Sequence, residues 1–128
     1  MTSDSTDNMA KRWREFQESL LRSEEYMARA EFGPRVTKWL KESAIFRVEW
    51  NGDEIIPLFQ FSPEGATIPA MQSALLCLRP IASDWEIFAW FCQSDSWSCQ
   101  GQKPKDLLLS NPAAVVEAAK HMAADDWF

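Results

Sequence analysis

The chain has 128 residues, 46% of them hydrophobic and 25% charged, which is the size and composition of one globular domain with its own core. The formal net charge of −6 argues against nucleic-acid binding by the whole surface, because phosphate contacts need clustered Lys and Arg, but it permits a local basic patch. No apolar run reaches the roughly 18 residues that span a bilayer, and the polar start has no apolar leader, so we expect a cytoplasmic protein with no membrane contact.

The sequence predicts a mainly α fold of the α+β class, in which a disordered tail at residues 1–8 precedes a single domain over 9–128. Within this domain, residues 9–44 are expected to be helical, with a degenerate helix-turn-helix, 45–61 to form a β-hairpin, and 69–124 to form further helices. An isolated hairpin is marginal in water, so we expect helices from both sides of it in the sequence to cover its apolar face.

The N-terminal part of the chain shows helical spacing from Met9 onward. Trp13, Phe16 and Leu20 recur at three- and four-residue steps and predict a helix over 8–22. Charged residues fill the other faces of this helix, as in an amphipathic surface helix.

Two shorter helices are expected to follow. Ser23 can N-cap the first of them, which ends near Phe32. Gly33-Pro34 suits a helix stop followed by a helix start, and predicts a helix over 34–42. Two short helices joined by a Gly-containing turn have the outline of a helix-turn-helix, whose second helix can contact DNA; the alternative is an ordinary solvated helix face. The DNA-binding candidates are Arg35, Thr37, Lys38 and Lys41.

A β-hairpin is predicted around Asn51-Gly52, because both residues of a type I′ turn need positive φ. The expected cross-strand pairs are Trp50 with Asp53, Val48 with Ile55, and Phe46 with Pro57. Pro57 has no N–H to donate, so regular pairing is expected to stop near Ile56. Period-2 alternation predicts an apolar face of Phe46, Val48, Trp50, Ile55, Phe59 and Phe61, and a polar face of Arg47, Glu49, Glu54 and Gln60, with Ile56 as an exception.

The last third of the chain predicts four helices. One is expected over 69–79 and a second over 84–92, which an S-x-x-E capping box starting at Ser83 introduces. A short helix can begin at Pro104 and a last one at Pro112, because Pro is favoured in the first turn.

Seven Trp are many for this length, and Trp90, Trp97 and Trp127 do not all fit the predicted buried faces. Trp is a common anchor at protein interfaces, so one interpretation places some of these three at a contact surface. The alternative is that a small helical domain uses them in its core.

Residues that carry catalysis do not cluster in the sequence, so we expect a non-enzymatic protein with no catalytic site, no cofactor and no metal site. His121 is the only histidine, which leaves no two-His metal motif, and it suits a surface cation near a helix C-terminus. No spacing places a Cys beside His121 for nucleophilic catalysis, and Cys77, Cys92 and Cys99 are expected to be reduced thiols.

Three segments follow one another in an order and spacing that resemble a known family. They are IPLFQF at 56–61, which follows Asn51-Gly52, GQKPKDLL at 101–108, which follows the helix predicted over 84–92, and VVEAA at 115–119. This order is similar to that of the Xre/MbcA/ParS-type antitoxins, which often carry a degenerate helix-turn-helix ahead of the hairpin, and the likeness covers about residues 20–124.

The resemblance implies a non-enzymatic antitoxin that binds and neutralises a cognate toxin, commonly an NAD-degrading RES-domain enzyme, and that can form a homodimer. In such a protein the helix-turn-helix can bind operator DNA, so the alternative function is a transcriptional regulator. By position, the toxin-contacting residues are Gly101, Lys103, Pro104, Asp106 and Leu107, with Trp97 flanking the turn. The loop at 93–100 lacks the family's usual Pro-Asn-rich step and the 34–42 helix departs from a reader helix, which leaves a stand-alone immunity-like role open.

Overall fold

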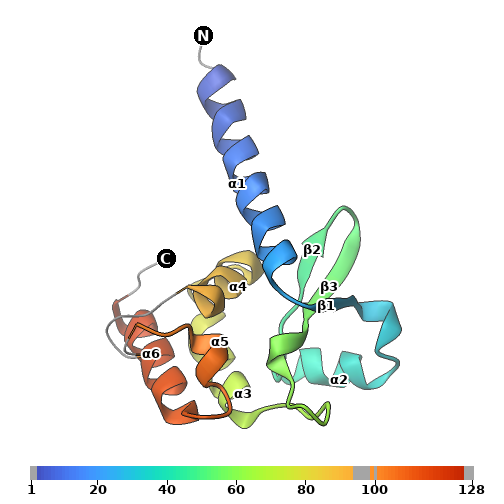
Figure 1. Cartoon of the computed structure of the whole chain (residues 1–128), viewed down its shortest axis with the longest axis vertical. Coiled ribbons are helices and arrows are strands. Elements are labelled where there is room, and N and C mark those ends of the chain that lie inside the picture. The colour runs from blue at the N-terminus through green and yellow to red at the C-terminus, as the bar shows by residue number, and fades with distance from the viewer. Residues whose placement is uncertain (1–2, 94–98, 100, 126–128) are drawn as a thin grey trace.

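A three-stranded antiparallel sheet lies between a group of helices and a single helix in the computed structural model, which describes residues 3–93, 99 and 101–125 (Figure 1). On one side of the sheet are α3 (Pro69–Leu78), α4 (Asp84–Cys92), α5 (Pro104–Leu107) and α6 (Pro112–Asp125). On the other side is α2 (Arg35–Lys41), close to the predicted 34–42. The expected fold class, a mainly α domain of α+β type, is confirmed.

The hairpin turns at Asn51-Gly52, as predicted. The two residues have φ of 52° and 85°, which a type I′ turn requires and which Asn and Gly adopt with least strain. The strands are β2 (Val48–Trp50) and β3 (Asp53–Pro57). Their pairs are Val48 with Ile55, Glu49 with Glu54, and Trp50 with Asp53. The predicted register is therefore confirmed over the whole of β2.

A third strand, β1 (Tyr26–Ala28), pairs with the other edge of β3. The prediction of a helix from 23 to 32 is therefore wrong, because this segment holds a strand and one 3-10 turn, η1 (Arg29–Glu31). β1 supplies hydrogen-bond partners to backbone groups of β3, a non-local gain that outweighs the helical preference of the segment itself. The helix-turn-helix outline consequently lacks its first helix, and α2 follows Gly33-Pro34 without one.

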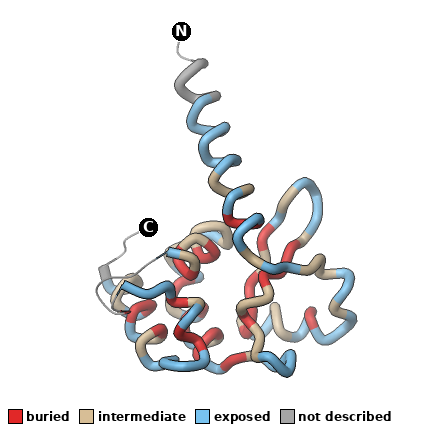
Figure 2. Tube along the Cα trace, viewed as in Figure 1, coloured by how far each residue is buried: buried red, intermediate tan, exposed pale blue. Residues whose placement is uncertain are grey.

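α1 (Ser3–Ser23) runs outward from the rest of the chain (Figure 1). Residues 3–8 are helical where the composition predicted a tail, so the predicted helix extends further toward the N-terminus. Its C-terminal turns are buried through Leu20 and Leu21, whereas Trp13 is 43% exposed, and Figure 2 shows the middle of α1, residues 8–15, exposed.

Side chains around the hairpin tip join it to α1 and α4. Arg14 Nη2 donates to Asn51 Oδ1 at 2.9 Å, and the Arg14 guanidinium lies 4.7 Å from the centre of the Trp50 ring. From α4, the Trp85 ring meets Trp50 edge-on at 5.8 Å, and Trp85 Nε1 donates to the carbonyl oxygen of Glu49 at 3.1 Å. Contacts from α1 and α4 thus stabilise the short hairpin, because an isolated two-stranded hairpin is only marginally stable in water.

The sheet separates a large hydrophobic core from a small one. The large core lies where the sheet meets α3, α4 and α6, and Figure 2 shows buried residues concentrated there. Val48 and Ile55 belong to it, as predicted. Ile56, the exception in the predicted alternation, faces the small core together with Val36 of α2. Phe61 also packs against the small core, contrary to its predicted face, because a turn interrupts the alternation before it.

Gln60 is a buried polar residue whose side chain bonds the backbone of the segment just before β2. Its predicted place on the polar face is wrong, since it lies in the 3-10 turn η2 (Leu58–Gln60) and is fully buried. Gln60 Oε1 accepts from the Phe46 N–H at 2.7 Å, and Nε2 donates to the carbonyl oxygens of Phe46 and Pro57, both at 3.0 Å. The expected strand pair of Phe46 with Pro57 does not form, and the amide takes its place.

The C-terminal helices follow the predicted boundaries closely. Ser83 and Glu86 form the expected capping box, in which the Ser83 N–H donates to Glu86 Oε1 at 2.9 Å and the Glu86 N–H donates to Ser83 Oγ at 3.3 Å. Trp90 is buried and meets the Phe91 ring edge-on at 4.9 Å, so the core alternative holds for this Trp. Trp97 and Trp127 lie outside the described residues.

Gln60→Ala is expected to lower the free energy of unfolding by about 3–5 kcal/mol, because it leaves buried backbone groups of Phe46 and Pro57 without partners. Gln72→Ala is the control, since Gln72 Nε2 also donates to a backbone carbonyl, that of Glu42 at 2.8 Å, but at a half-exposed position where water can replace it. Urea denaturation of the two variants should show less than about 1 kcal/mol for Gln72→Ala. Similar losses would contradict the role given to Gln60.

Candidate functional site

The predicted toxin-contacting turn, residues 101–107, is called the α5 elbow below because α5 begins in its middle. Gly101, Lys103 and Asp106 are exposed and are available to a partner. Pro104 and Leu107 are buried by the chain itself, so these two predicted contact residues hold the elbow in place and do not face a partner. The sixth predicted residue, Trp97, lies outside the described residues.

An ion pair fixes the α5 elbow to the segment that enters the sheet. Lys105 Nζ lies 3.4 Å from Glu24 Oε1 and 3.2 Å from Asp106 Oδ1. The Lys105 and Glu24 side chains are only 17% and 9% exposed, so solvent screens this pair less than a surface pair. Burial by itself lowers the pKa of Lys105, but the hydrogen bond to Asp106 and the charge of Glu24 outweigh it and raise the pKa above its ordinary value. Lys105 is therefore charged at neutral pH.

Cys92, at the end of α4, sits in the electrostatic surroundings of the same elbow. Burial raises the pKa of its thiol from 9.0 to about 12, and the negative charge of Glu24 adds to the rise. A thiol with this pKa stays protonated at neutral pH and is a poor nucleophile. In the residues that the structure describes, no group of three or more His, Cys, Asp or Glu side chains is placed to hold a metal ion.

The predicted DNA-contacting residues all lie on α2 and are exposed: Arg35, Thr37, Lys38 and Lys41. They differ in the contacts that their side chains already make with neighbouring residues. Lys38 Nζ lies 3.9 Å from Glu42 Oε1, and the Arg35 guanidinium lies 5.7 Å from the centre of the Trp39 ring. Thr37 Oγ1 accepts a hydrogen bond from Arg29, so it is tied to a neighbouring charged network.

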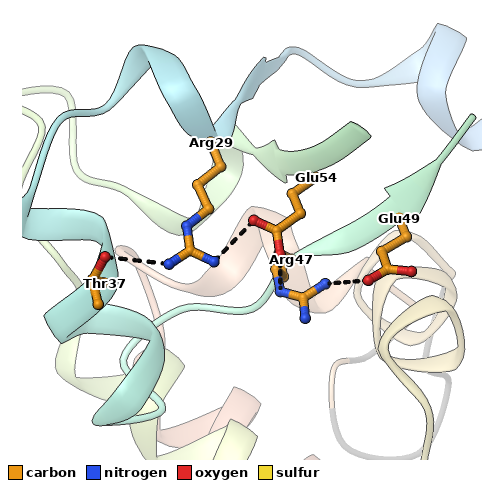
Figure 3. Close-up of polar contacts among 5 residues, drawn as sticks. All are labelled: Arg29, Thr37, Arg47, Glu49 and Glu54. Carbon is orange, nitrogen blue, oxygen red and sulfur yellow. Dashed lines mark hydrogen bonds and ion pairs between the residues drawn. The ribbon is translucent and has the colours of Figure 1, made fainter. Parts of the chain in front are cut away.

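Figure 3 shows this network, which lies on the opposite face of the sheet from Val48 and Ile55 of the large core. The Glu54 carboxylate bridges two guanidinium groups, with Oε2 2.9 Å from Arg29 Nη1 and Oε1 3.1 Å from Arg47 Nε. Arg47 Nη1 continues to Glu49 Oε1 at 3.1 Å, and Arg29 Nη2 donates to Thr37 Oγ1 at 3.2 Å. The side chains of Arg29, Arg47 and Glu54 are about one-third exposed (30–33%), so the network is partly shielded from solvent.

Two clefts of opposite charge flank the network. The larger, of about 680 Å³, includes the acidic residues Glu49, Asp53 and Glu54 in its lining. The smaller, of about 280 Å³, includes the basic residues Lys41, Arg47 and Arg79. Arg29 and Thr37 line both clefts, so their hydrogen bond marks the boundary between an acidic side and a basic side of one face.

Sequence reasoning missed this double cleft. The alternation in the hairpin did place Arg47, Glu49 and Glu54 on one polar face, which was the available signal. Arg29 was assigned to a helix, and without β1 nothing brings it beside Glu54. Arg79 follows α3 and reaches the cleft only through the tertiary packing of that helix.

No family model, curated protein or solved structure matches the chain in comparisons with known proteins. Among the described helices, none is long and apolar enough to cross a membrane.

Glu24→Gln combined with Lys105→Met in a double-mutant cycle is expected to give a coupling of about 1 kcal/mol in the free energy of unfolding, because the pair is mostly buried. The control is the Glu117–Lys120 pair, 3.7 Å apart with both side chains at least 60% exposed, for which we expect less than about 0.5 kcal/mol. Since the pKa of Lys105 is raised, its contribution is present at neutral pH and is lost as the pH rises through that pKa. Equal couplings in the two cycles would show that the elbow is not anchored by this pair.

Proposed function

We propose that the chain is an antitoxin-like, non-enzymatic protein that binds and neutralises a cognate toxin, with an NAD-degrading RES-type enzyme as the expected kind of target. The observation that carries this proposal is the construction of the α5 elbow. Gly101, Lys103 and Asp106 are exposed, whereas Pro104 and Leu107 of the same turn are buried and hold it in place.

Rigidity at this position favours tight binding. A contact loop that is already ordered loses little conformational entropy when a partner binds. The elbow is held by apolar burial and by the mostly buried Lys105–Glu24 pair. A protonated, unreactive Cys92 beside the elbow fits a binding surface better than a reaction centre.

The charge of the chain also indicates the kind of target. The net charge of −6 favours encounters with a basic surface. The larger cleft adds a concentrated acidic area lined by Glu49, Asp53 and Glu54. A toxin with a basic substrate cleft would be attracted to such a protein before specific contacts form.

Co-expression with the product of the neighbouring reading frame is expected to restore growth that this product alone inhibits, and the two proteins should co-purify. Lys103→Glu and Asp106→Lys should each weaken the complex by about tenfold or more, because they reverse charges at the exposed part of the elbow. Lys120→Glu is the matched control, because Lys120 is an exposed residue of α6. Failure of the unaltered chain both to restore growth and to form a complex would overturn the proposal.

A second candidate function, DNA binding by α2, is favoured by the exposure of Arg35, Thr37, Lys38 and Lys41 on one short helix. The strand β1 in place of the first helix weighs against a standard helix-turn-helix arrangement. The chain is therefore proposed first as a protein-binding partner and second as a regulator of its own operon.

Binding of the chain to its own promoter fragment is expected to weaken steeply as salt concentration rises if α2 contacts phosphates. Lys38→Glu should then reduce the affinity by about tenfold, measured by fluorescence anisotropy with a labelled fragment, whereas Lys120→Glu should leave it unchanged. An affinity that neither salt nor Lys38→Glu alters would exclude this second function.

A further inference from the structure

The smaller cleft brings together four cations from four separate parts of the chain. Arg29 comes from η1, Lys41 from the end of α2, Arg47 from the segment before β2, and Arg79 from the residue after α3. The chain as a whole carries 13 basic and 19 acidic residues, so this local excess runs against the average charge of the molecule. Like charges repel at short range, so a fold that clusters cations without a functional reason would lose stability.

Half of this positive charge is already compensated. Glu54 lies between Arg29 and Arg47, and Glu49 contacts Arg47 as well. These contacts use Nε and Nη1 of Arg47, so its Nη2 remains available to a ligand. Glu54 and Glu49 therefore orient the two guanidinium groups without saturating them.

The other half is not compensated by an ion pair. Within the described part of the chain, the side chains of Lys41 and Arg79 make no hydrogen bond and no ion pair. The one acidic residue that lines this cleft, Asp84, forms no ion pair with either of them. Thr37 adds a hydroxyl group at the boundary of the cleft. The cleft is thus lined by cationic donors from several separate elements and by a single carboxylate.

We infer that the smaller cleft is a binding site for a compact phosphate group, such as that of a small phosphate monoester. Phosphate offers three or more oxygens in a tetrahedral arrangement, which can accept from Lys41, Arg79, Arg47 Nη2 and Thr37 Oγ1 together. A carboxylate has only two oxygens in one plane and would leave several of these donors unused. The volume of about 280 Å³ admits the phosphate and a small attached group.

A nucleic-acid strand fits the same face less well. Its phosphates extend along the backbone, and a strand leaving this cleft past Arg29 would run into the larger cleft with Glu49, Asp53 and Glu54. Repulsion from these carboxylates opposes a continuous phosphate track. The observations therefore favour a small phosphorylated molecule. This site is separate from the α5 elbow, and its test does not depend on toxin binding.

The experiment is a titration of the ¹⁵N-labelled full chain with inorganic phosphate and then with phenyl phosphate, at constant ionic strength held with chloride and followed by amide NMR shifts. We expect saturable shifts that centre on Thr37, Lys41 and Arg79 at low-millimolar phosphate or below. Arg79→Gln and Lys41→Gln should each weaken binding by about tenfold, the usual effect of losing one charge-assisted contact. Both side chains are exposed and unpaired in the described structure, so these variants should fold normally.

Lys38→Gln is the matched control, because Lys38 lies on the same helix but is directed to Glu42 and does not line the cleft. It should change the phosphate affinity by less than about twofold, as expected for a screened surface charge. Equal weakening by Lys38→Gln and Lys41→Gln, or the absence of saturable shifts, would overturn the inference. Tighter binding of a ten-nucleotide single strand than of phenyl phosphate would also overturn it and assign the cleft to nucleic acid.

Discussion

The amide of Gln60 is the contact on which the arrangement of the sheet depends. A three-residue β2 pairs with β3 over a short distance, and beyond Val48 the ladder would leave the backbone of Phe46 without partners inside the core. One side chain satisfies both the N–H and the carbonyl of Phe46 and also reaches Pro57. Because an unpaired buried polar group costs more than an ordinary hydrogen bond contributes, few other side chains could occupy this position.

Holding the segment before β2 in this way positions one of the two candidate surfaces, the charged face. Arg47 follows Phe46 directly and is thereby set on the face opposite the large core, where it meets Glu54. The other surface depends on the opposite end of the sheet. Glu24 precedes β1 and pairs with Lys105, so the strand that enters the sheet also supports the α5 elbow. A small sheet in a mainly α protein thus serves as the common frame for the two candidate surfaces.

Local chemistry decided what the sequence could predict. Asn51-Gly52 determines its own turn, and the turn determines the register, so the hairpin was predicted pair by pair. The C-terminal helices begin with Pro or a capping box and were also predicted closely. β1 was missed because its preference for strand comes from an edge of β3 far along the chain. Gln60 was placed on the wrong face because alternation ends once the chain enters η2.

The candidate sites show the same difference between features set by residue type, which could be predicted, and features set by packing, which could not. The exposed positions of the α5 elbow could be chosen from residue type, but the burial of Pro104 and Leu107 depends on how α5 packs against α4 and α6. The two clefts could not be predicted from the sequence, because they form only when the fold brings Arg29 and Arg79 to the hairpin.

Glu54 gives the charged face an unusual sensitivity to a single change. Its one carboxylate holds two guanidinium groups that are brought together from different parts of the sequence. Loss of that carboxylate would remove one negative charge and separate the two guanidinium groups, leaving Arg47 paired with Glu49 and Arg29 bonded to Thr37. A single point mutation would thereby shift the charge balance of this face toward the basic side, and one substitution would change the class of ligand that the face favours.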